Sequence, residues 1–272
     1  MNAKRITSYF KTPHLSYRIW KVWRRDQDVF MKTYKVNFIP PVVEPIFYLV
    51  GLGFGLGGFV ALQGGIDYIV FIAPALVASQ MMYSSFFETT YASFVRMYFQ
   101  KTFDAIIATP VSLEEVIAGE LVWGATKSLI NSAIVLGVIA AVTAFSPYKL
   151  ITGPWFLLIL PLSFLVGLMF SALGMCFTAI SPNIDSFNYP SFLFITPMFI
   201  LSGTFFPITT LPVDVQAFAN IFFPLTHAVA LSRALAIGNI QPTLLLNLAW
   251  FLVTTPFFFV LSINMMKKRL IK

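Results

Sequence analysis

Long apolar runs alternate with short polar segments along most of the chain. Each run holds about 20 or more mostly uncharged residues, the length that an α-helix needs to cross the hydrocarbon core of a bilayer. The runs cover residues 38–61, 69–94, 116–144, 154–180, 189–208 and 243–265. The pattern therefore predicts an all-α membrane protein with six transmembrane helices.

A second pattern precedes the first run. From residue 14 to residue 25, apolar side chains recur at helical spacing and basic side chains fall on the opposite arc. The residues concerned are Leu15, Arg18, Ile19, Trp20, Lys21, Val22, Trp23, Arg24 and Arg25. This pattern is typical of an amphipathic helix that lies in the membrane surface. The alternative is a basic tail without such a helix.

The segment between the fifth and sixth runs is too apolar for a solvated loop. Pro207, Pro212 and Pro224 interrupt it, and proline disfavours a continuous helix because it lacks a backbone N–H. Irregular backbone at membrane depth must be buried against protein. We therefore expect residues 209–235 to form a re-entrant pair of short helices at the outer membrane face.

Basic residues predict the orientation. Those before the first run are Lys4, Arg5, Lys11, Arg18, Lys21, Arg24, Arg25, Lys32 and Lys35, and those after the last are Lys267, Lys268, Arg269 and Lys272. Positive residues mark the cytoplasmic side, so both termini are expected there. The predicted organisation is a cytoplasmic segment (1–36), a transmembrane domain (37–266) and a basic tail (267–272) of a multi-pass protein in the cell (inner) membrane.

Composition excludes a water-soluble fold. Hydrophobic residues make up 58% of the 272 residues and charged residues 11%, whereas soluble domains carry roughly 25% charged residues. The net charge of +7 comes largely from the flanks of apolar runs, so nucleic acid is not an expected partner.

Glycines in the first run resemble a dinucleotide-binding fingerprint only in their spacing. That motif must follow a strand and open a helix, which an apolar span does not allow. Gly51 with Gly55, and Gly53 with Gly57, instead place small residues four apart. Such pairs let two membrane helices approach closely, in a dimer or within one chain.

Four ionisable residues lie inside the predicted spans: Glu44, Glu88, Glu120 and Lys127. Such residues are costly in a bilayer and are functional candidates. Glu88 and Lys127 fall at similar depth in neighbouring spans, which predicts an ion pair between them. The pair could fasten two helices or take part in gating. Glu120 lies near the cytoplasmic boundary and could reach the interface without a special role.

Aromatic and apolar residues are mixed with charges between the second and third spans. Tyr98, Phe99, Phe103 and Ile107 stand near Lys101 and Asp104 there, which indicates an amphipathic helix that could dock in a partner's groove. A helix lying along the membrane surface would show a similar pattern. Ser112 and Glu115 resemble a capping box at the start of the third span.

No enzymatic site is expected. The chain has no phosphate-binding GxxxxGK[ST] loop and no recognisable catalytic triad. His14 and His227 lie far apart and Cys176 is the only cysteine, so no metal site is expected either. Phe187, Tyr189, Phe192 and Phe194 crowd the start of the fifth run and could form an aromatic wall of a substrate pathway, although core or lipid-facing packing is the more common role.

The order of these parts resembles the permease subunits of ABC-2 type exporters, which have the type V exporter fold, and most closely their nodulation protein J-like branch. The resemblance covers nearly the whole chain. It depends on the segments "VWRRD", "EPIFYLVGLGFGLG", "FETTYASFVRM", "TFDAIIATPVSLEEVIAGELVWGATK", "LMFSALGMCFTAISPNIDSFNY" and "PMFILSGTFFPITTLPVDVQ". Glu44 stands where close relatives have an aspartate.

The resemblance implies a homodimer bound to two copies of an ATPase subunit, which would bind ATP and Mg²⁺ in place of this chain. It implies that residues near 98–109, including Tyr98, Phe99, Lys101, Thr102, Phe103, Asp104 and Ile107, form the coupling helix, and that residues 14–25 form the interface helix. The first and fifth spans of the two copies would face each other, so that Gly51 to Gly58 pack in the dimer.

Members of this branch typically move lipid-linked or lipidated oligosaccharides outward. Relatives export drugs and other hydrophobic small molecules, which is the alternative substrate class. A secondary transporter or channel that works without ATP is a further alternative, but the chain shows no internal repeat of the kind that secondary transporters have.

Overall fold

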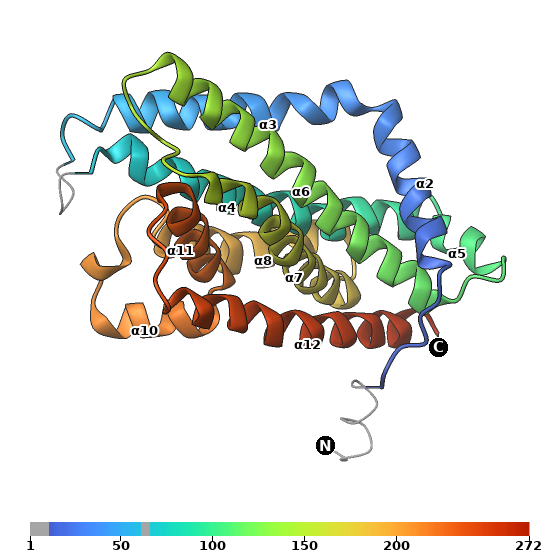
Figure 1. The fold of residues 1–272 in the computed structure, drawn as a ribbon. Helices are drawn as coiled ribbons and strands as arrows, with labels where there is room; N and C mark the ends of the chain where they lie inside the picture. The colour runs from blue at the N-terminus through green and yellow to red at the C-terminus, as the bar shows by residue number, and fades with distance from the viewer. Residues whose placement is uncertain (1–10, 61–65, 272) are drawn as a thin grey trace.

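The structure, a computed structural model, describes residues 11–60 and 66–271. All regular elements in this part of the chain are helices (Figure 1). They are α2 (Ile19–Lys32), α3 (Tyr34–Tyr48), α4 (Tyr68–Phe87), α5 (Thr102–Ile107), α6 (Leu113–Phe145), α7 (Ile159–Ile180), α8 (Asn188–Pro190), α9 (Thr196–Leu201), α10 (Val213–Phe222), α11 (Pro224–Ile237) and α12 (Leu244–Leu270). The predicted span end at residue 61 and the basic residues Lys4, Arg5 and Lys272 lie outside the described residues.

Five continuous helices in the described ranges are long and apolar enough to cross a membrane. They are Tyr34–Phe54, Tyr68–Phe99, Leu113–Phe145, Pro154–Ile180 and Leu244–Leu270, where π-helical or 3₁₀ turns extend the α-helices. They correspond to the predicted spans one to four and six. The predicted helical membrane architecture is therefore confirmed.

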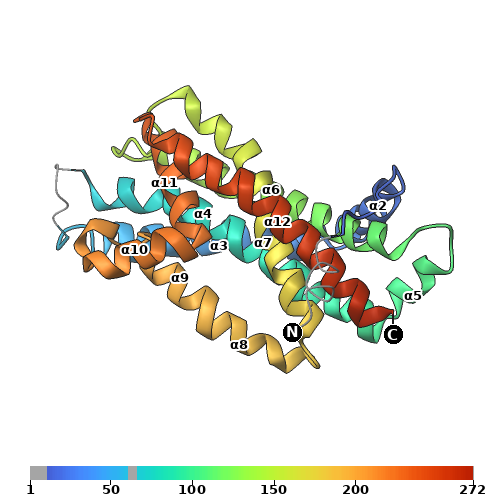
Figure 2. The same ribbon diagram turned by 90° about the horizontal axis from the view of Figure 1, so that it is seen from below.

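The fifth predicted span, 189–208, is wrong in its extent. The continuous helix begins with a 3₁₀ turn (Ile184–Phe187), runs through α8, a π-helical turn (Ser191–Ile195) and α9, and ends at Leu201, so it begins and ends earlier than predicted. It ends because Gly203 adopts a positive φ of 77°, a backbone conformation that suits glycine. Figure 2 shows α8 and α9 as one oblique helix along an edge of the molecule.

Helices α10 and α11 occupy the segment that was predicted to be a re-entrant pair. They meet at Phe223 with a bend of 92°. His227 in α11 contacts both neighbours, because its ring nitrogens lie 2.7 Å from Asn247 Oδ1 in α12 and 2.9 Å from the carbonyl oxygen of Asn220 in α10. The buried polar groups at this bend thus find partners within the protein, as membrane depth requires.

The core forms around α7, which packs against α4, α6 and α12. Small residues permit close contact: a Cβ atom on Gly167 would lie 2.4 Å from the Ser128 Cβ in α6. Hydroxyl groups join the same helices, since Ser128 donates to the Ser163 carbonyl at 2.9 Å and Thr178 to the Thr89 carbonyl at 2.7 Å. Close backbone approach and interhelical hydrogen bonds are the usual means of helix association in membranes.

The N-terminal amphipathic helix lies further along the chain than residues 14–25. It covers Ile19–Lys32, and its buried residues are Val22, Asp26 and Phe30. This arc packs against α6, where Gly119 leaves room for the Val22 side chain. Leu15 and Arg18 precede the helix, and Trp20 and Trp23 stack with ring centroids 4.2 Å apart. The contact of this helix with α6, which the sequence does not reveal, determines where the helix begins and ends.

One end of the molecule carries α2, α5 and the C-terminal end of α12, and the opposite end carries α10 and the start of α4 (Figure 1). We call the first the α5 end. The predicted capping box at the start of α6 is present there, since Ser112 Oγ accepts from the Glu115 N–H and the Glu115 carboxylate accepts from the Ser112 N–H.

The contact between α2 and α6 gives a testable prediction. A Cβ atom on Gly119 would lie 2.6 Å from Val22 Cβ, so Gly119→Ala should displace α2 and destabilise the protein by about 1–3 kcal/mol. Gly137→Ala in the same helix meets no atom within 4 Å and should be neutral or slightly stabilising. Melting temperatures in lipid nanodiscs measure both, and equal values for the two variants would contradict the packing.

Candidate functional site

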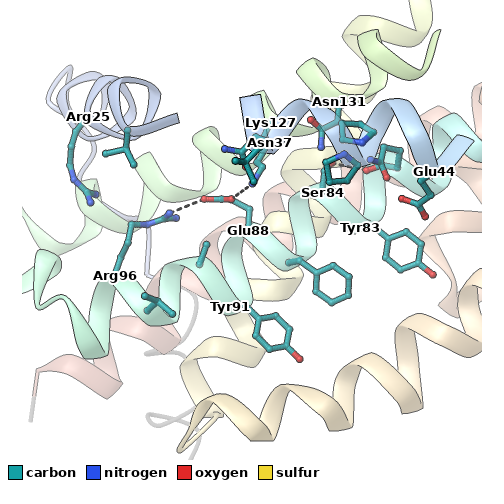
Figure 3. A pocket seen from close by; sticks show the side chains of 18 of the residues that line it. Arg25, Asn37, Glu44, Tyr83, Ser84, Glu88, Tyr91, Arg96, Lys127 and Asn131 are labelled. Atoms are coloured by element: carbon teal, nitrogen blue, oxygen red, sulfur yellow. Dashed lines mark hydrogen bonds and ion pairs between the residues drawn. The ribbon is translucent and has the colours of Figure 1, made fainter. Parts of the chain in front are cut away.

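A cavity of about 1010 Å³ lies between α2 and α3 on one side and the second and third long helices on the other (Figure 3). Its lining residues include Arg25, Asn37, Pro40, Pro41, Glu44, Tyr48, Gln80, Tyr83, Ser84, Glu88, Tyr91, Arg96, Lys127 and Asn131. Charged residues gather toward the α5 end, whereas Glu44 lies at the other side of the view, beside Tyr83. The cavity therefore has a region rich in charge and a region with a single carboxylate.

Helix α3 contributes backbone acceptors to this cavity. Pro40 and Pro41 lie inside the helix and have no N–H to donate to the carbonyl groups of Val36 and Asn37, one turn earlier. All four residues line the cavity. The prolines thus leave two carbonyl oxygens without their usual helical partner at its wall.

Glu88 forms the predicted ion pair with Lys127, whose Nζ lies 2.7 Å from Glu88 Oε2. The other oxygen of Glu88 receives hydrogen bonds from Arg96 Nη1 at 2.8 Å and Trp123 Nε1 at 3.2 Å. The sequence predicted this pair from the similar depth of the two residues in neighbouring spans. The structure shows that Arg96 is a second basic partner of Glu88.

Arg96 links Glu88 to two further carboxylates. Its Nε lies 3.1 Å from Glu120 Oε1 and 3.9 Å from Asp26 Oδ1. Arg25 in turn lies 2.9 Å from Asp26 Oδ1 and 3.8 Å from Glu120 Oε1. We call Arg25, Asp26, Glu88, Arg96, Glu120 and Lys127 the ion-pair network. It balances three acids with three bases and joins α2 to the second and third long helices.

Two expectations about these residues are wrong. Glu120 is fully buried in the ion-pair network and does not reach the membrane interface. Arg25 turns toward Asp26 and away from the exposed basic arc of α2. The sequence analysis did not identify Asp26 or Arg96 as site residues. For Asp26 a signal was present, because the spacing of four residues from Val22 and from Phe30 places this acid on the apolar arc of the helix.

Burial raises the pKa of the Asp26 carboxyl to about 8, and the nearby Glu120 carboxylate raises it further against the opposing effect of Arg96 and Arg25. One oxygen of Asp26, Oδ2, is buried without a hydrogen-bond partner among the described residues. A protonated Asp26 at neutral pH is consistent with this environment, because burial disfavours the charged form.

The residues predicted to dock a partner separate into two groups. Phe103 is only 1% exposed and packs in the core, so it does not belong to a docking surface. Tyr98, Phe99 and Ile107 are 52%, 61% and 39% exposed. The predicted single helix over residues 98–109 is divided, because Lys101 adopts a left-handed conformation with φ 54° between Phe99 and Thr102.

The four aromatic residues predicted near a substrate pathway do not line the cavity. Phe187 is buried in the core beside Tyr91 and Phe94. Tyr189 and Phe192 are exposed on the outer side of α8 and the following turn, and Phe194 packs against the core. Their spacing places them on different arcs of one helix.

The glycines of the first span also differ in their surroundings. A Cβ atom on Gly53 would lie 2.8 Å from the Ile69 side chain of α4, so Gly53 serves a contact within the chain. Gly51 is exposed and a Cβ atom there would meet nothing within 4 Å. Gly55 is exposed and Gly57 half-buried.

The raised pKa of Asp26 predicts how stability depends on pH. The unfolded carboxyl loses its proton near pH 3.8 and the folded one near pH 8, so the folded state binds this proton more tightly. Its contribution to stability should therefore fall as pH rises from about 4 to about 8. Asp26→Asn should lessen this fall in melting temperature, whereas Asp28→Asn, an exposed position on the same helix, should not. Parallel pH profiles for native chain and Asp26→Asn would contradict the assignment.

Removing Arg96 tests the balance of the ion-pair network. Arg96→Met removes the base that Glu88, Glu120 and Asp26 share and should destabilise the protein by about 3–5 kcal/mol, because buried carboxylates lose a basic partner. Adding Glu120→Leu should restore part of that loss. The exposed Arg24→Met serves as the control. Thermal melts of the purified variants measure the effect, and the absence of any restoration in the double variant argues against coupling through Arg96.

Comparisons with known proteins agree with this architecture. The sequence model described as ABC-2 type transporter matches residues 17–237. Nodulation protein J of Rhizobium leguminosarum bv. trifolii is 36% identical over 253 residues, covering 92% of this chain and 93% of that protein. Nodulation protein J of Bradyrhizobium diazoefficiens is 33% identical over 260 residues, covering 96% and 97%.

A more distant relative is the inner membrane transport permease YadH of Escherichia coli (strain K12). It is 22% identical over 200 residues, which cover 74% of this chain and 75% of that protein. The family match spans most of the chain, from α2 to the end of α11. The chain therefore belongs to the ABC-2 type transporter family and is a multi-pass permease subunit of an ABC transporter.

Proposed function

We propose that two copies of this chain, with two copies of an ATPase subunit, export a lipid-linked or lipidated oligosaccharide by alternating access. The observation that carries the proposal is the ion-pair network, which connects α2 at the α5 end directly to the wall of the cavity through Glu88, Arg96 and Lys127. A movement of the α5 end would thereby be transmitted to the wall of the cavity.

The α5 end is the side proposed to face the cytoplasm. It carries exposed basic residues of α2 and the basic last turn of α12. An excess of lysine and arginine marks the cytoplasmic side of a membrane protein. In this orientation the protein lies in the cell (inner) membrane with both termini on the cytoplasmic side. An ATPase subunit on that side could then reach α5.

The proposed docking surface consists of Tyr98, Phe99, Lys101, Asp104 and Ile107, all of which are exposed. Apolar side chains flanked by both charges suit insertion into a groove of a folded partner. Phe103 and the half-buried Ile106 hold the segment to the core from its other side. ATP and Mg²⁺ would bind to the partner, and their hydrolysis would move α5 and α2 together.

The homodimer is supported by an exposed apolar face beside the cavity. Val43, Ile46, Phe47 and Val50 project from the first span. Lipid could cover this face, but a second copy would also close the cavity between the two chains. Alternating access requires the cavity to close on one side of the membrane while it opens on the other. The ion-pair network would let α2, the second span and the third span shift as a unit.

Disrupting the docking surface tests the proposal. Phe99→Asp together with Ile107→Asp puts charge on two exposed apolar contacts and should abolish co-purification of the ATPase subunit and transport-linked ATP turnover. Phe145→Asp, an exposed aromatic at the far end of α6, should change neither. All variants should elute as the native chain does, because the substituted residues are exposed. Unchanged ATPase binding by the double variant would refute the docking assignment.

A further inference from the structure

Three side chains in the cavity have hydrogen-bonding groups without partners in the described part of the chain. Glu44 in α3 is exposed and forms no ion pair or hydrogen bond there, and the Gln80 amide in α4, in a residue that is 8% exposed, forms none either. Asn131 in α6 is only 6% exposed, and its Oδ1 atom is buried without a partner. We call Glu44, Gln80 and Asn131 the polar triplet.

The polar triplet lies deep in the membrane. Glu44 stands near the middle of Tyr34–Phe54, and Asn131 near the middle of Leu113–Phe145. Of the triplet's polar atoms, Asn131 Oδ1 is buried without a partner, and no lipid can supply it with a hydrogen bond. The neighbouring Glu88 pairs with both Arg96 and Lys127, so the charged residues of the cavity wall already have partners, whereas the triplet has none.

The charged group of the triplet and its buried atom without a partner are both acceptors, while the Gln80 amide can donate as well as accept. A carboxylate accepts hydrogen bonds and donates none, and the unpaired Asn131 atom is a carbonyl oxygen. Tyr48 and Tyr83 line the cavity together with Glu44, and Figure 3 shows Tyr83 beside it. A ligand that fits must supply several donors and an apolar face.

We propose that the polar triplet is the headgroup site of the cargo, where Glu44 and Asn131 accept hydrogen bonds from the hydroxyl or amide N–H groups of a saccharide on an apolar chain. The inference rests on the proposed function and specifies which part of the cargo this chain would recognise. A phosphate headgroup lacks those donors when ionised and would be repelled by Glu44, while the basic residues that could attract it are already paired.

Binding to the full chain in lipid nanodiscs tests the site without ATP. The probes are a fluorescent alkyl maltoside and an alkyl phosphate with the same chain and label, with empty nanodiscs as the baseline. The native chain should bind the maltoside at least about tenfold more tightly than the phosphate. Glu44→Gln and Asn131→Leu should each weaken maltoside binding about tenfold, the loss expected for one strong hydrogen bond.

Glu44→Gln should also strengthen binding of the alkyl phosphate, because it removes a negative charge, and a purely structural role would not produce that change. Asp185→Asn, which removes a carboxylate outside the cavity, is the matched control and should leave both affinities as they are. Native affinity for the maltoside in both cavity variants, tighter binding of the phosphate by the native chain, or no binding of the maltoside would each overturn the proposal.

The two proposals fail separately. If the maltoside binds as expected but no ATPase subunit co-purifies with the chain, the headgroup site stands and the ATP-driven exporter does not. If the ATPase subunit co-purifies and the cavity variants bind the maltoside normally, the exporter stands and the headgroup site is refuted.

Discussion

Arg96 holds its guanidinium between carboxylates from two other helices, in a region where little water can solvate either charge. Because each carboxylate of the ion-pair network would be costly without a basic partner, α2, the second long helix and the third long helix must keep their relative positions. The cavity is bounded by the same elements. Its shape at the α5 end is therefore set by charge pairing, while packing of small residues around α7 sets the rest of the core.

This arrangement gives the cavity two regions with different chemistry. Toward the α5 end the charges neutralise each other and form a mechanical link between the surface and the cavity wall. Deeper in the membrane the polar triplet has unmet hydrogen-bonding capacity. The proposed mechanical link and the proposed headgroup site thus lie in one cavity, and the second and third long helices contribute residues to both.

The exposed parts of the α5 end complete this picture. Phe103 is held in the core, while Phe99 and Ile107 remain exposed on the same short segment. A segment that packs against the core on one side and is exposed on the other can transmit the movement of a bound partner to the helices that it contacts. Val22 and Gly119 join α2 to α6 just beside that segment, so α2 would move with α6.

Much of the architecture followed from sequence, because hydropathy over about 20 residues is a local property and similar depth in adjacent spans brought Glu88 to Lys127. Sequence could not decide which arc of an apolar helix faces protein, since lipid and protein core favour the same side chains. Only the tertiary structure therefore buried Glu120, turned Phe103 inward, separated the aromatic residues at 187–194 and brought Glu44, Gln80 and Asn131 to one cavity. The end of the fifth helix was likewise decided by the turn at Gly203, which hydropathy does not detect.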